Sequence, residues 1–436
     1  MSHMINKVQG LGLAALTKLA SSEVLDQLRL RKFIERSLYQ GSKTSFSALS
    51  KSQKLLKSKQ QQKKPSDSKQ RLNPQSKNLF DLGLTEEQTM LREALQGFAS
   101  EVIYPAAAQA DNAAKFPAQL WTQAQGLGLN FYALPESYGG VAAEQSVVSN
   151  VLIAEDLARG DYSLAAGLLS TFSVVNAITR WGNIEIQSKY LTAFAEDSEI
   201  QASIASQEAT PAFNPLQLKT KTSKLDHGYE ITGEKTLVIL GESADLLLVT
   251  ADLNGKPEVF IVEPDQSIAS KPTPAMGLKA AETVTLRFNQ TPAQRLGNDD
   301  FNYQEFLDLG NLMWCAMAVG TAEAVKAYCI EYANQRIAFG EPISHRQSVA
   351  FMIADIAIEI DAMRMLVWNA ASLAEAGQNF HREAYLARLL CAEKSMKIGT
   401  DGVQILGGHG FTKEHPVERW YRDLRATAIM QSGLHA

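Results

Sequence analysis

The stretch QILGGHGF at residues 404–411 is the most informative part of the sequence, and it continues through PVE at 416–418 to YRD at 421–423. Long helical patterns precede this stretch, and a pair of glycines lies within it. Gly407 and Gly408 have no Cβ, so the backbone there can approach another molecule closely. Gln404 lies one helical turn earlier and carries an amide that can hydrogen-bond a ligand. The stretch therefore predicts a helix end that holds a ligand.

A second segment, RIAFG at residues 336–340 followed by Gln347, suits an anionic ligand. The guanidinium of Arg336 offers a planar donor fork that matches two phosphate oxygens. Phe339 supplies an apolar wall, and Gly340 lets the backbone turn before the next helix. Taken alone, a helix end capped by Arg and Gly is the better interpretation. Beside residues 404–410 we favour a diphosphate ligand.

The pattern of apolar residues divides the chain into helices, then strands, then helices. Helical spacing begins at Leu84, where Thr85 and Gln88 form a capping-box sequence, and continues to about residue 200. Alternating residues indicate strands between about 201 and 295, with a hairpin turn at Asn254-Gly255. Helical patterns return after residue 303. We predict an α+β, mostly α fold with domains at 80–200, 201–298 and 299–436.

Composition excludes several classes of protein. The chain has 436 residues, 45% of them hydrophobic, with a formal net charge of −5. Its three cysteines do not form a CxxC pair, so neither a disulfide scaffold nor a zinc site is expected. No stretch approaches about 18 consecutive apolar residues. No GxGxxG or P-loop sequence is present, so a Rossmann dinucleotide site is not supported. The sequence indicates a soluble protein of a reducing compartment and no metal site.

The first 79 residues differ from the rest in charge. They carry 16 Lys and Arg against 4 Asp and Glu, a net of +12, whereas the remainder has a net charge of −17. Residues 1–49 read as two short amphipathic helices, and residues 50–79 as a solvated Ser/Gln/Lys-rich linker. An anionic membrane surface or an acidic protein suits this extension, and a transit peptide is the alternative. With almost no aromatic residues between Lys51 and Lys77, we expect no nucleic-acid partner.

Five segments, in this order and spacing, closely resemble the acyl-CoA dehydrogenase family. They are PESYGG at 135–140, ITGEK at 231–235, the segment from Arg336 to Gln347, QILGGHGF at 404–411, and the run from Pro416 to Asp423. The likeness covers about residues 80–436. It implies an N-terminal helical domain, a middle β domain and a C-terminal four-helix bundle. It also implies FAD at a subunit interface, with the ADP half held by Arg336, Phe339, Gln347, Gln404, Gly407 and Gly408.

The flavin side departs from the family pattern. Members usually have Thr-Glu-Pro-Gly-x-Gly-Ser-Asp before the β domain, whereas this chain has QEATPAFN at 207–214, in which Glu208 is kept. Members often have Trp-Ile-Thr after the Gly-Glu-Lys motif, where this chain has Leu237, Val238 and Ile239. The resemblance implies that Gln207, Val238 and Ile239 border the flavin, with backbone amides replacing some of the lost side-chain donors.

The largest departure is at the catalytic base. The resemblance implies removal of an α-proton from a fatty acyl thioester while a β-hydride passes to the flavin, which requires a carboxylate. In most members a Glu follows Tyr-Arg-Asp after seven residues, and here that position is Gln431. Other members place the Glu on the helix that enters the bundle, where this chain has about Gly310, with Glu305 and Asp308 nearby. A neutral amide cannot take the proton.

Three explanations of Gln431 stay open. It is an engineered Glu→Gln substitution, which the vector-like start Met1-Ser2-His3-Met4 makes plausible, or a natural change in a subunit that pairs with a base-bearing one, or the mark of a pseudoenzyme. We expect an oxidoreductase of fatty acid β-oxidation that uses FAD, acts on fatty acyl-CoA and passes electrons to an electron-transfer flavoprotein. Its activity in this form is doubtful.

Assembly and location are expectations of the same kind. We expect a homodimer, homotetramer or heteromer, cytoplasmic if bacterial and in the mitochondrial matrix if eukaryotic. Residues 1–49 are expected to provide a peripheral membrane contact. The alternatives are a non-catalytic or half-site subunit of a heteromeric acyl-CoA dehydrogenase, and a membrane-associated scaffold.

Overall fold

The computed structural model describes residues 83–436, apart from 142–144, 197–198, 211 and 300. The helices and linker expected within residues 1–79 lie outside this part. The first described helix, α4 (Glu86–Phe98), begins with the predicted capping box. The backbone N–H of Gln88 donates to Thr85 Oγ1, and that of Thr85 donates to Gln88 Oε1, both at 3.1 Å. Two amides that lack helical acceptors are thereby satisfied.

Residues 91–436 form one compact unit. Its N-terminal part is helical. The elements are η2 (Ala99–Ile103), α5 (Tyr104–Ala113), α6 (Ala118–Leu127), α7 (Leu129–Ala133), η3 (Glu136–Tyr138), α8 (Val147–Ala158), α9 (Tyr162–Trp181) and α10 (Ile184–Glu196).

Helix α9 is the central helix of this part. Asp161 caps it by accepting from the N–H of Leu164 at 3.0 Å. By length and composition α9 could cross a membrane, but 94% of its apolar window is buried inside the fold, as in the core helix of a globular protein.

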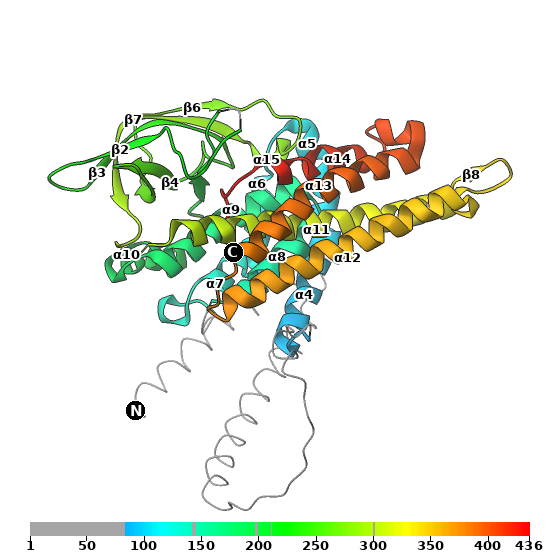
Figure 1. Ribbon diagram of the computed structural model, residues 1–436, viewed down its shortest axis with the longest axis horizontal. Helices are drawn as coiled ribbons and strands as arrows, with labels where there is room; N and C mark the ends of the chain where they lie inside the picture. Colours follow the sequence, from blue (N-terminus) through cyan, green and yellow to red (C-terminus); the bar gives the residue numbers. More distant parts are fainter. Residues whose placement is uncertain (1–82, 142–144, 197–198, 211, 300) are drawn as a thin grey trace, which may run out of the picture. The chain divides into compact units, whose positions relative to one another are not determined.

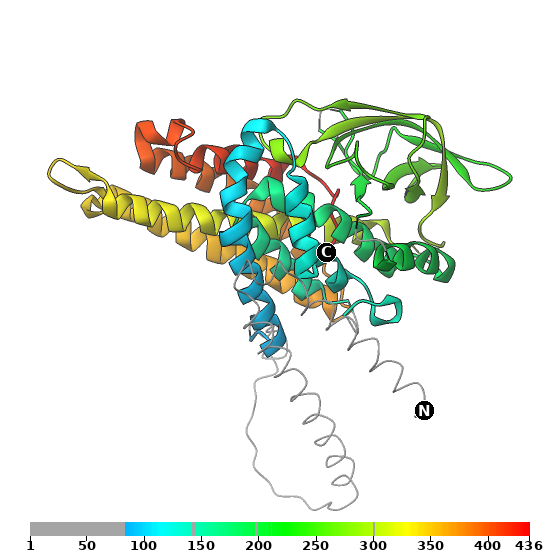
Figure 2. The same ribbon diagram turned by 180° about the vertical axis from the view of Figure 1, so that it is seen from behind.

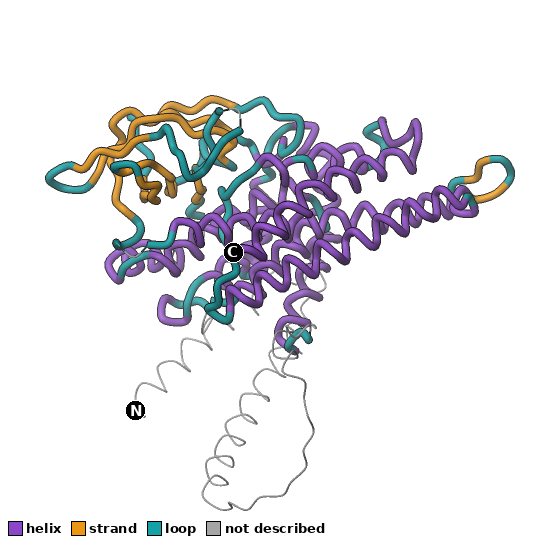
Figure 3. Tube along the Cα trace, in the orientation of Figure 1, coloured by secondary structure: helices purple, strands orange, loops and turns teal. Residues whose placement is uncertain are grey.

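A seven-stranded sheet follows. Its strands are β1 (Ala202–Ala205), β2 (Lys221–Lys224), β3 (Tyr229–Val238), β4 (Leu246–Leu253), β5 (Lys256–Val262), β6 (Ile268–Pro272) and β7 (Val284–Arg295). The order is β1-β4-β2-β3-β7-β5, β6 pairs with β7, and β5 also pairs with β4, so the path closes on itself. Its core includes Val249, Phe260 and Phe288. The strands form one block beside the helices (Figure 3).

The predicted β4–β5 hairpin is confirmed. Leu253 pairs with Lys256, and the two residues between them, Asn254 and Gly255, have φ angles of 55° and 85°. Positive φ at both central residues defines the turn whose twist matches paired strands.

Long helices make up the rest of the chain. They are α11 (Tyr303–Gln335), α12 (Gln347–Glu375), α13 (His381–Leu406), α14 (Val417–Leu424) and α15 (Ala426–Ile429). The short elements among them are β8 (Ile337–Ala338), β9 (Glu341–Pro342), η5 (Ile343–His345) and η6 (Gly407–Phe411). Helix α11 packs against α8, α12 and α13, and these helices run side by side (Figures 1 and 2).

This architecture confirms the predicted fold class: a helical part, a sheet and a C-terminal helical bundle. The strands of the seven-stranded sheet begin at Ala202 and end at Arg295, with helices on either side. The individual domain bounds stay predictions, because residues 91–436 pack as one unit in which α9 contacts β1. All three cysteines are buried and free.

Candidate functional site

Gln431 lies on a turn that follows α15 and is held by both the sheet and the bundle. The Ser206 hydroxyl, just after β1, donates to the Gln431 carbonyl at 3.0 Å. The Trp314 indole N–H on α11 donates to the carbonyl of Ser432 at 2.7 Å. The turn also lies against Gly310, where an added Cβ would stand 2.6 Å from Leu434 O and 2.9 Å from Ser432 Cα. The position near Gly310, which the resemblance implied as the other place for a base, therefore has no room for a side chain.

The Gln431 side chain points its amide nitrogen at the sheet side: its Nε2 donates to the carbonyl of Phe213 at 3.3 Å. The two carboxylates suggested as replacements for the base have other partners. Glu305 forms an ion pair with Arg180. Asp308 Oδ2 lies 2.8 Å from His381 Nδ1, and burial raises the pKa of this carboxyl despite that contact.

The helix geometry also separates Asp308 from the turn. Residues two positions apart in an α-helix, such as 308 and 310, point in directions that differ by about 200° around its axis. Gly310 faces the turn, so Asp308 faces away from it and towards α13. Neither carboxylate is placed to act in place of residue 431.

The structure brings the predicted flavin-side residues close to this turn. Gln207 directly follows Ser206, and the Gln207 carbonyl accepts from the N–H of Thr236 at 2.9 Å. Val238 and Ile239, two and three residues after Thr236, are buried. The Ile239 carbonyl accepts from the hydroxyl of Ser203 on β1. Residues 207, 238 and 239 therefore gather where β1 and the end of β3 meet.

Polar atoms without partners mark the same place. Gln207 Oε1, Asn311 Oδ1 and Ser432 Oγ are buried and have no hydrogen-bond partner among the described residues. A buried polar atom of this kind costs about 1–3 kcal/mol unless a partner satisfies it. Gln207 belongs to the segment after β1, Asn311 to α11 and Ser432 to the turn itself. Each leaves a buried oxygen that a polar ligand can satisfy.

A buried ion pair that the sequence reasoning missed supports this segment. Lys235 is fully buried, and its Nζ lies 2.9 Å from Glu208 Oε1, 3.1 Å from Ser206 O and 3.1 Å from Thr250 Oγ1. Burial lowers the pKa of Lys235 to about 8 although Glu208 opposes the change. For Glu208, burial is outweighed by the Lys235 charge and by backbone donors, so its pKa is lowered. The Gly-Glu-Lys motif and the kept Glu208 were the sequence signals of this pair.

The residues predicted to hold a diphosphate lie at the opposite end of α11. Arg336 ends that helix, is exposed, and forms no ion pair among the described residues. Phe339, in the β8–β9 hairpin, is 96% exposed. Gln347 starts α12 and is exposed, as are Gln404, Gly407 and Gly408 at the end of α13. A Cβ on either glycine would meet nothing within 4 Å, so the backbone there is open to a ligand.

Aromatic residues connect the Arg336 end to the glycine pair. Tyr332 Oη lies 3.0 Å from Nδ1 of His409, the residue after Gly408. A pocket of about 290 Å³ opens beside Arg336. It is lined by Tyr328, Glu331, Tyr332, Gln335, Arg336 and His415. Arg336 and the Gly407-Gly408 segment are thus at the same end of the bundle.

The two groups of predicted residues are far apart within one chain. Gly310 contacts the Gln431 turn, and Arg336 follows the end of the same helix. At 1.5 Å per residue the helix axis places them roughly 39 Å apart, and Figure 1 shows the β8 hairpin well away from α15. A single extended dinucleotide does not span this distance. One ligand that uses both groups must therefore lie between two chains.

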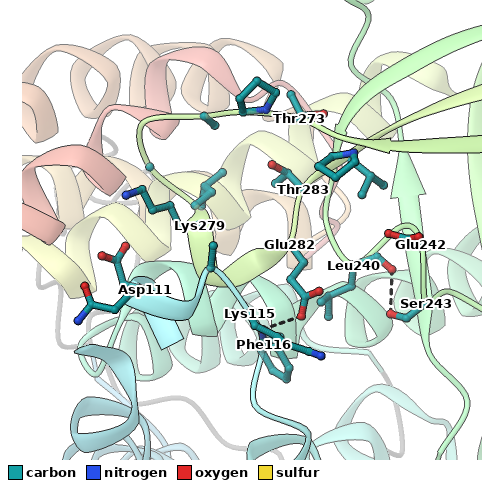
Figure 4. A pocket seen from close by; sticks show the side chains of 18 of the residues that line it. Asp111, Lys115, Phe116, Leu240, Glu242, Ser243, Thr273, Lys279, Glu282 and Thr283 are labelled. Atoms are coloured by element: carbon teal, nitrogen blue, oxygen red, sulfur yellow. Dashed lines mark hydrogen bonds between the residues drawn. The ribbon is translucent and has the colours of Figure 1, made fainter. Parts of the chain in front are cut away.

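Another pocket, of about 660 Å³, is elsewhere and is lined by none of the predicted site residues. It lies between the α5–α6 loop, the β3–β4 loop and the loop before β7 (Figure 4). Two of its three acidic residues have partners: Arg422 contacts both Asp111 oxygens, and Phe116 N donates to Glu282 at 2.7 Å. We assign no ligand to this pocket.

Comparisons with known proteins agree with these observations. The family profile described as "Acyl-CoA dehydrogenase, N-terminal domain" matches residues 85–198, and that of the C-terminal domain matches residues 302–433. The chain is 33% identical to an acyl-CoA dehydrogenase of Bacillus subtilis, covering 80% of this chain and 95% of that protein.

Two solved structures are similar over nearly their whole length. Butyryl-CoA dehydrogenase from Megasphaera elsdenii matches with 29% identity and a TM-score of 0.74, covering 80% of this chain and 95% of that one. A chain in a structure described as the electron transferring flavoprotein of Acidaminococcus fermentans matches with 28% identity, a TM-score of 0.74 and the same coverage.

Proposed function

This chain belongs to the acyl-CoA dehydrogenase family, and we propose that it binds FAD and a fatty acyl-CoA in an oligomer but desaturates the acyl group very slowly in the form given by this sequence. General acyl-CoA oxidation is the activity that the family implies. The observation that limits it here is Gln431, an amide on a fixed turn where the reaction needs a carboxylate.

The residues present fit FAD, the cofactor that family membership implies. At one end of the bundle, Arg336 forms no ion pair with a described residue and offers its donor fork to a diphosphate, and the Gly407-Gly408 backbone is open nearby. At the turn, the unsatisfied oxygens of Gln207 and Ser432 suit a polar ring system. Bound FAD would supply the hydride acceptor for oxidation of a Cα–Cβ bond.

The protein's own part in the reaction is to orient the thioester and to remove the α-proton. The turn at residue 431 is fixed by Ser206 and Trp314, so whatever side chain it carries is held in place. A positioned general base contributes about 10²- to 10⁴-fold to a rate. An amide nitrogen that donates to Phe213 O has no basic lone pair to offer. Binding should therefore survive while proton removal does not.

An absorbance titration tests this proposal. The purified protein should be yellow, and a saturated fatty acyl-CoA should shift the flavin bands without bleaching them during a normal turnover time. Rapid bleaching by the unchanged chain would show that another base acts. A colourless protein that takes up no added FAD would refute the cofactor assignment.

A half-site subunit is the second candidate function, because the Arg336 end is intact while the base is missing. The roughly 39 Å between the two groups means that the Arg336 end of one chain would serve a flavin near another chain's turn. A partner that carries a Glu at this position would then complete one active site. Co-expression with such a partner, followed by measurement of FAD per chain, separates the two candidates: one FAD per chain in the isolated protein favours the homo-oligomer.

The outer face of α12 supports self-association. Phe351, Ile358 and Met365 recur every seven residues, and each is more than 40% exposed. Residues seven apart lie on one side of a helix, so these three form an apolar stripe that another chain would cover.

Electron transfer and location complete the proposal. The match to the electron transferring flavoprotein structure supports such a protein as the electron acceptor. A cytoplasmic location, or the mitochondrial matrix in a eukaryote, and a membrane contact through residues 1–49 remain proposals that rest on composition alone.

A further inference from the structure

Arg388 holds the end of α15 directly before residue 431. Its Nη1 lies 2.8 Å from the carbonyl oxygen of Met430 and 3.4 Å from that of Thr427, and its Nη2 lies 3.5 Å from that of Ala428. The Met430 carbonyl belongs to the peptide unit that links it to Gln431. The guanidinium on α13 therefore contacts the backbone that sets the position of the residue-431 side chain.

No described residue supplies this guanidinium with a counter-charge. Arg388 is half-buried, and it forms no ion pair with any described residue. The titratable side chains around it are Tyr162 on α9, Cys315 on α11 and Cys391 on α13. Burial raises the pKa of Tyr162 and of Cys391, so both keep their protons at neutral pH.

Other charges near the turn are paired, apart from Arg425 at the start of α15, which donates to the Tyr421 hydroxyl at 3.0 Å and forms no ion pair with a described residue. On the sheet side, Lys235 pairs with Glu208. On α11, Asp308 contacts His381 and Glu305 pairs with Arg180. His435, in the last residues of the chain, is neutral because burial lowers its pKa to about 3. Arg388 thus supplies an unmatched positive charge next to position 431.

We propose that Arg388 positions the turn that carries residue 431 and makes this position electrostatically suited to an anionic group. The inference rests on the proposed function only in taking position 431 as that of the base. A charge that is partly removed from water is stabilised by a nearby opposite charge. Arg388 has none beside the neutral Gln431, and a carboxylate at position 431 would supply one.

A purely structural role for Arg388 predicts something different. Arginine side chains often donate to the last carbonyls of a helix, and such a cap would stabilise α15 whatever residue follows. The electrostatic role predicts in addition that Arg388 changes the proton affinity of a carboxylate at position 431.

The test measures that proton affinity in the full chain. The substitution Gln431→Glu is introduced into three backgrounds: the parent, Arg388→Gln and Arg388→Lys. Urea unfolding of each protein is measured from pH 3.5 to 7 and compared with that of the same background without Gln431→Glu. Arg382→Gln is the matched control: it removes a positive charge from the same helix, but Arg382 contacts Glu383 and not the turn. FAD and turnover are not needed, so failure of the proposed function does not affect the result.

With Arg388 present, the introduced carboxylate should titrate below about 4.3, the ordinary value for Glu. A depressed folded-state pKa gives stability that is present above the unfolded value and lost as pH falls through the folded value. Arg388→Gln should lower the acid dissociation constant of the glutamate at position 431 at least tenfold, which is a rise of about one unit in its pKa. Arg388→Lys should restore most of the effect, and Arg382→Gln should change little.

Two results would overturn the proposal. One is a carboxylate that titrates above 4.3 in the parent background, because burial would then outweigh the Arg388 charge. This outcome is decisive even if Arg388→Gln does not fold. The other is an equal shift from Arg388→Gln and Arg382→Gln, which would show a general charge effect.

Discussion

At the scale of single residues, the Lys235–Glu208 pair offers a clear contrast between buried and exposed charge. Lys235→Met should destabilise the protein by about 3–5 kcal/mol, because it leaves Glu208 buried without a counter-charge. Lys189 and Glu263 form a pair in which both side chains are 60% exposed, so Lys189→Met should cost less than about 1 kcal/mol. Urea unfolding at pH 7 measures both. Equal losses would contradict the role given to burial.

The pH dependence of the same lysine can also be predicted. Its folded-state pKa of about 8 lies below the ordinary 10.5, so the folded protein binds fewer protons than the unfolded chain between these values. Relative to Lys235→Met, the parent should therefore gain stability as pH rises from about 8 to 10.5. Unfolding free energies at pH 7.5, 9 and 10 follow this difference, and a difference that shrinks over this range would contradict the shift.

At the scale of elements, Gly310 determines how closely α11 approaches the turn. Gly→Ala inside a helix usually stabilises by about 0.5–1 kcal/mol, but here the new methyl would lie 2.6 Å from Leu434 O. Gly310→Ala should instead destabilise the protein by about 1–3 kcal/mol. Asn334→Ala, at an exposed position of the same helix, is the control and should be neutral or stabilising. Thermal unfolding compares them.

Local elements were the part of the fold that could be predicted from sequence. The Thr85–Gln88 capping box and the Asn254-Gly255 turn depend on residues three or fewer apart, so their chemistry is visible in the sequence itself. The contact of Gly310 with Ser432 joins residues 122 apart, and nothing local indicates it. The same is true of Arg388, whose role depends on a turn about 40 residues later. Family resemblance located Gln431 but gave no account of what holds it.

At the scale of the whole molecule, the proposed FAD site requires two chains, because its two groups of residues lie far apart within one chain. Arg336→Ala removes a charge-assisted contact worth about 1.5–3 kcal/mol, which is roughly ten- to a hundredfold in FAD affinity. Arg346, exposed and paired with Glu341 in the adjoining segment, provides the control Arg346→Ala. Fluorescence titration with FAD measures both, and unchanged affinity in Arg336→Ala would refute the assignment.

The exposed stripe on α12 gives a second prediction at this scale. Ile358→Asp places a charge in the middle of the apolar face, so the oligomer should dissociate and FAD should be lost with it. Sedimentation velocity reports the size, and the flavin absorbance of the same sample reports the cofactor. A monomer that keeps its FAD would show that one chain holds the whole cofactor.

The central claim is that position 431 is that of the missing base, and flavin reduction under single-turnover conditions tests it most directly. The unchanged chain and Gln431→Glu, both loaded with FAD, are mixed with excess fatty acyl-CoA in a stopped-flow instrument. Because Glu and Gln differ little in shape, both should bind the thioester. Only Gln431→Glu should bleach the flavin, at least about 10²-fold faster than the parent. Equal rates in the two proteins, with FAD and acyl-CoA bound to both, would contradict the account.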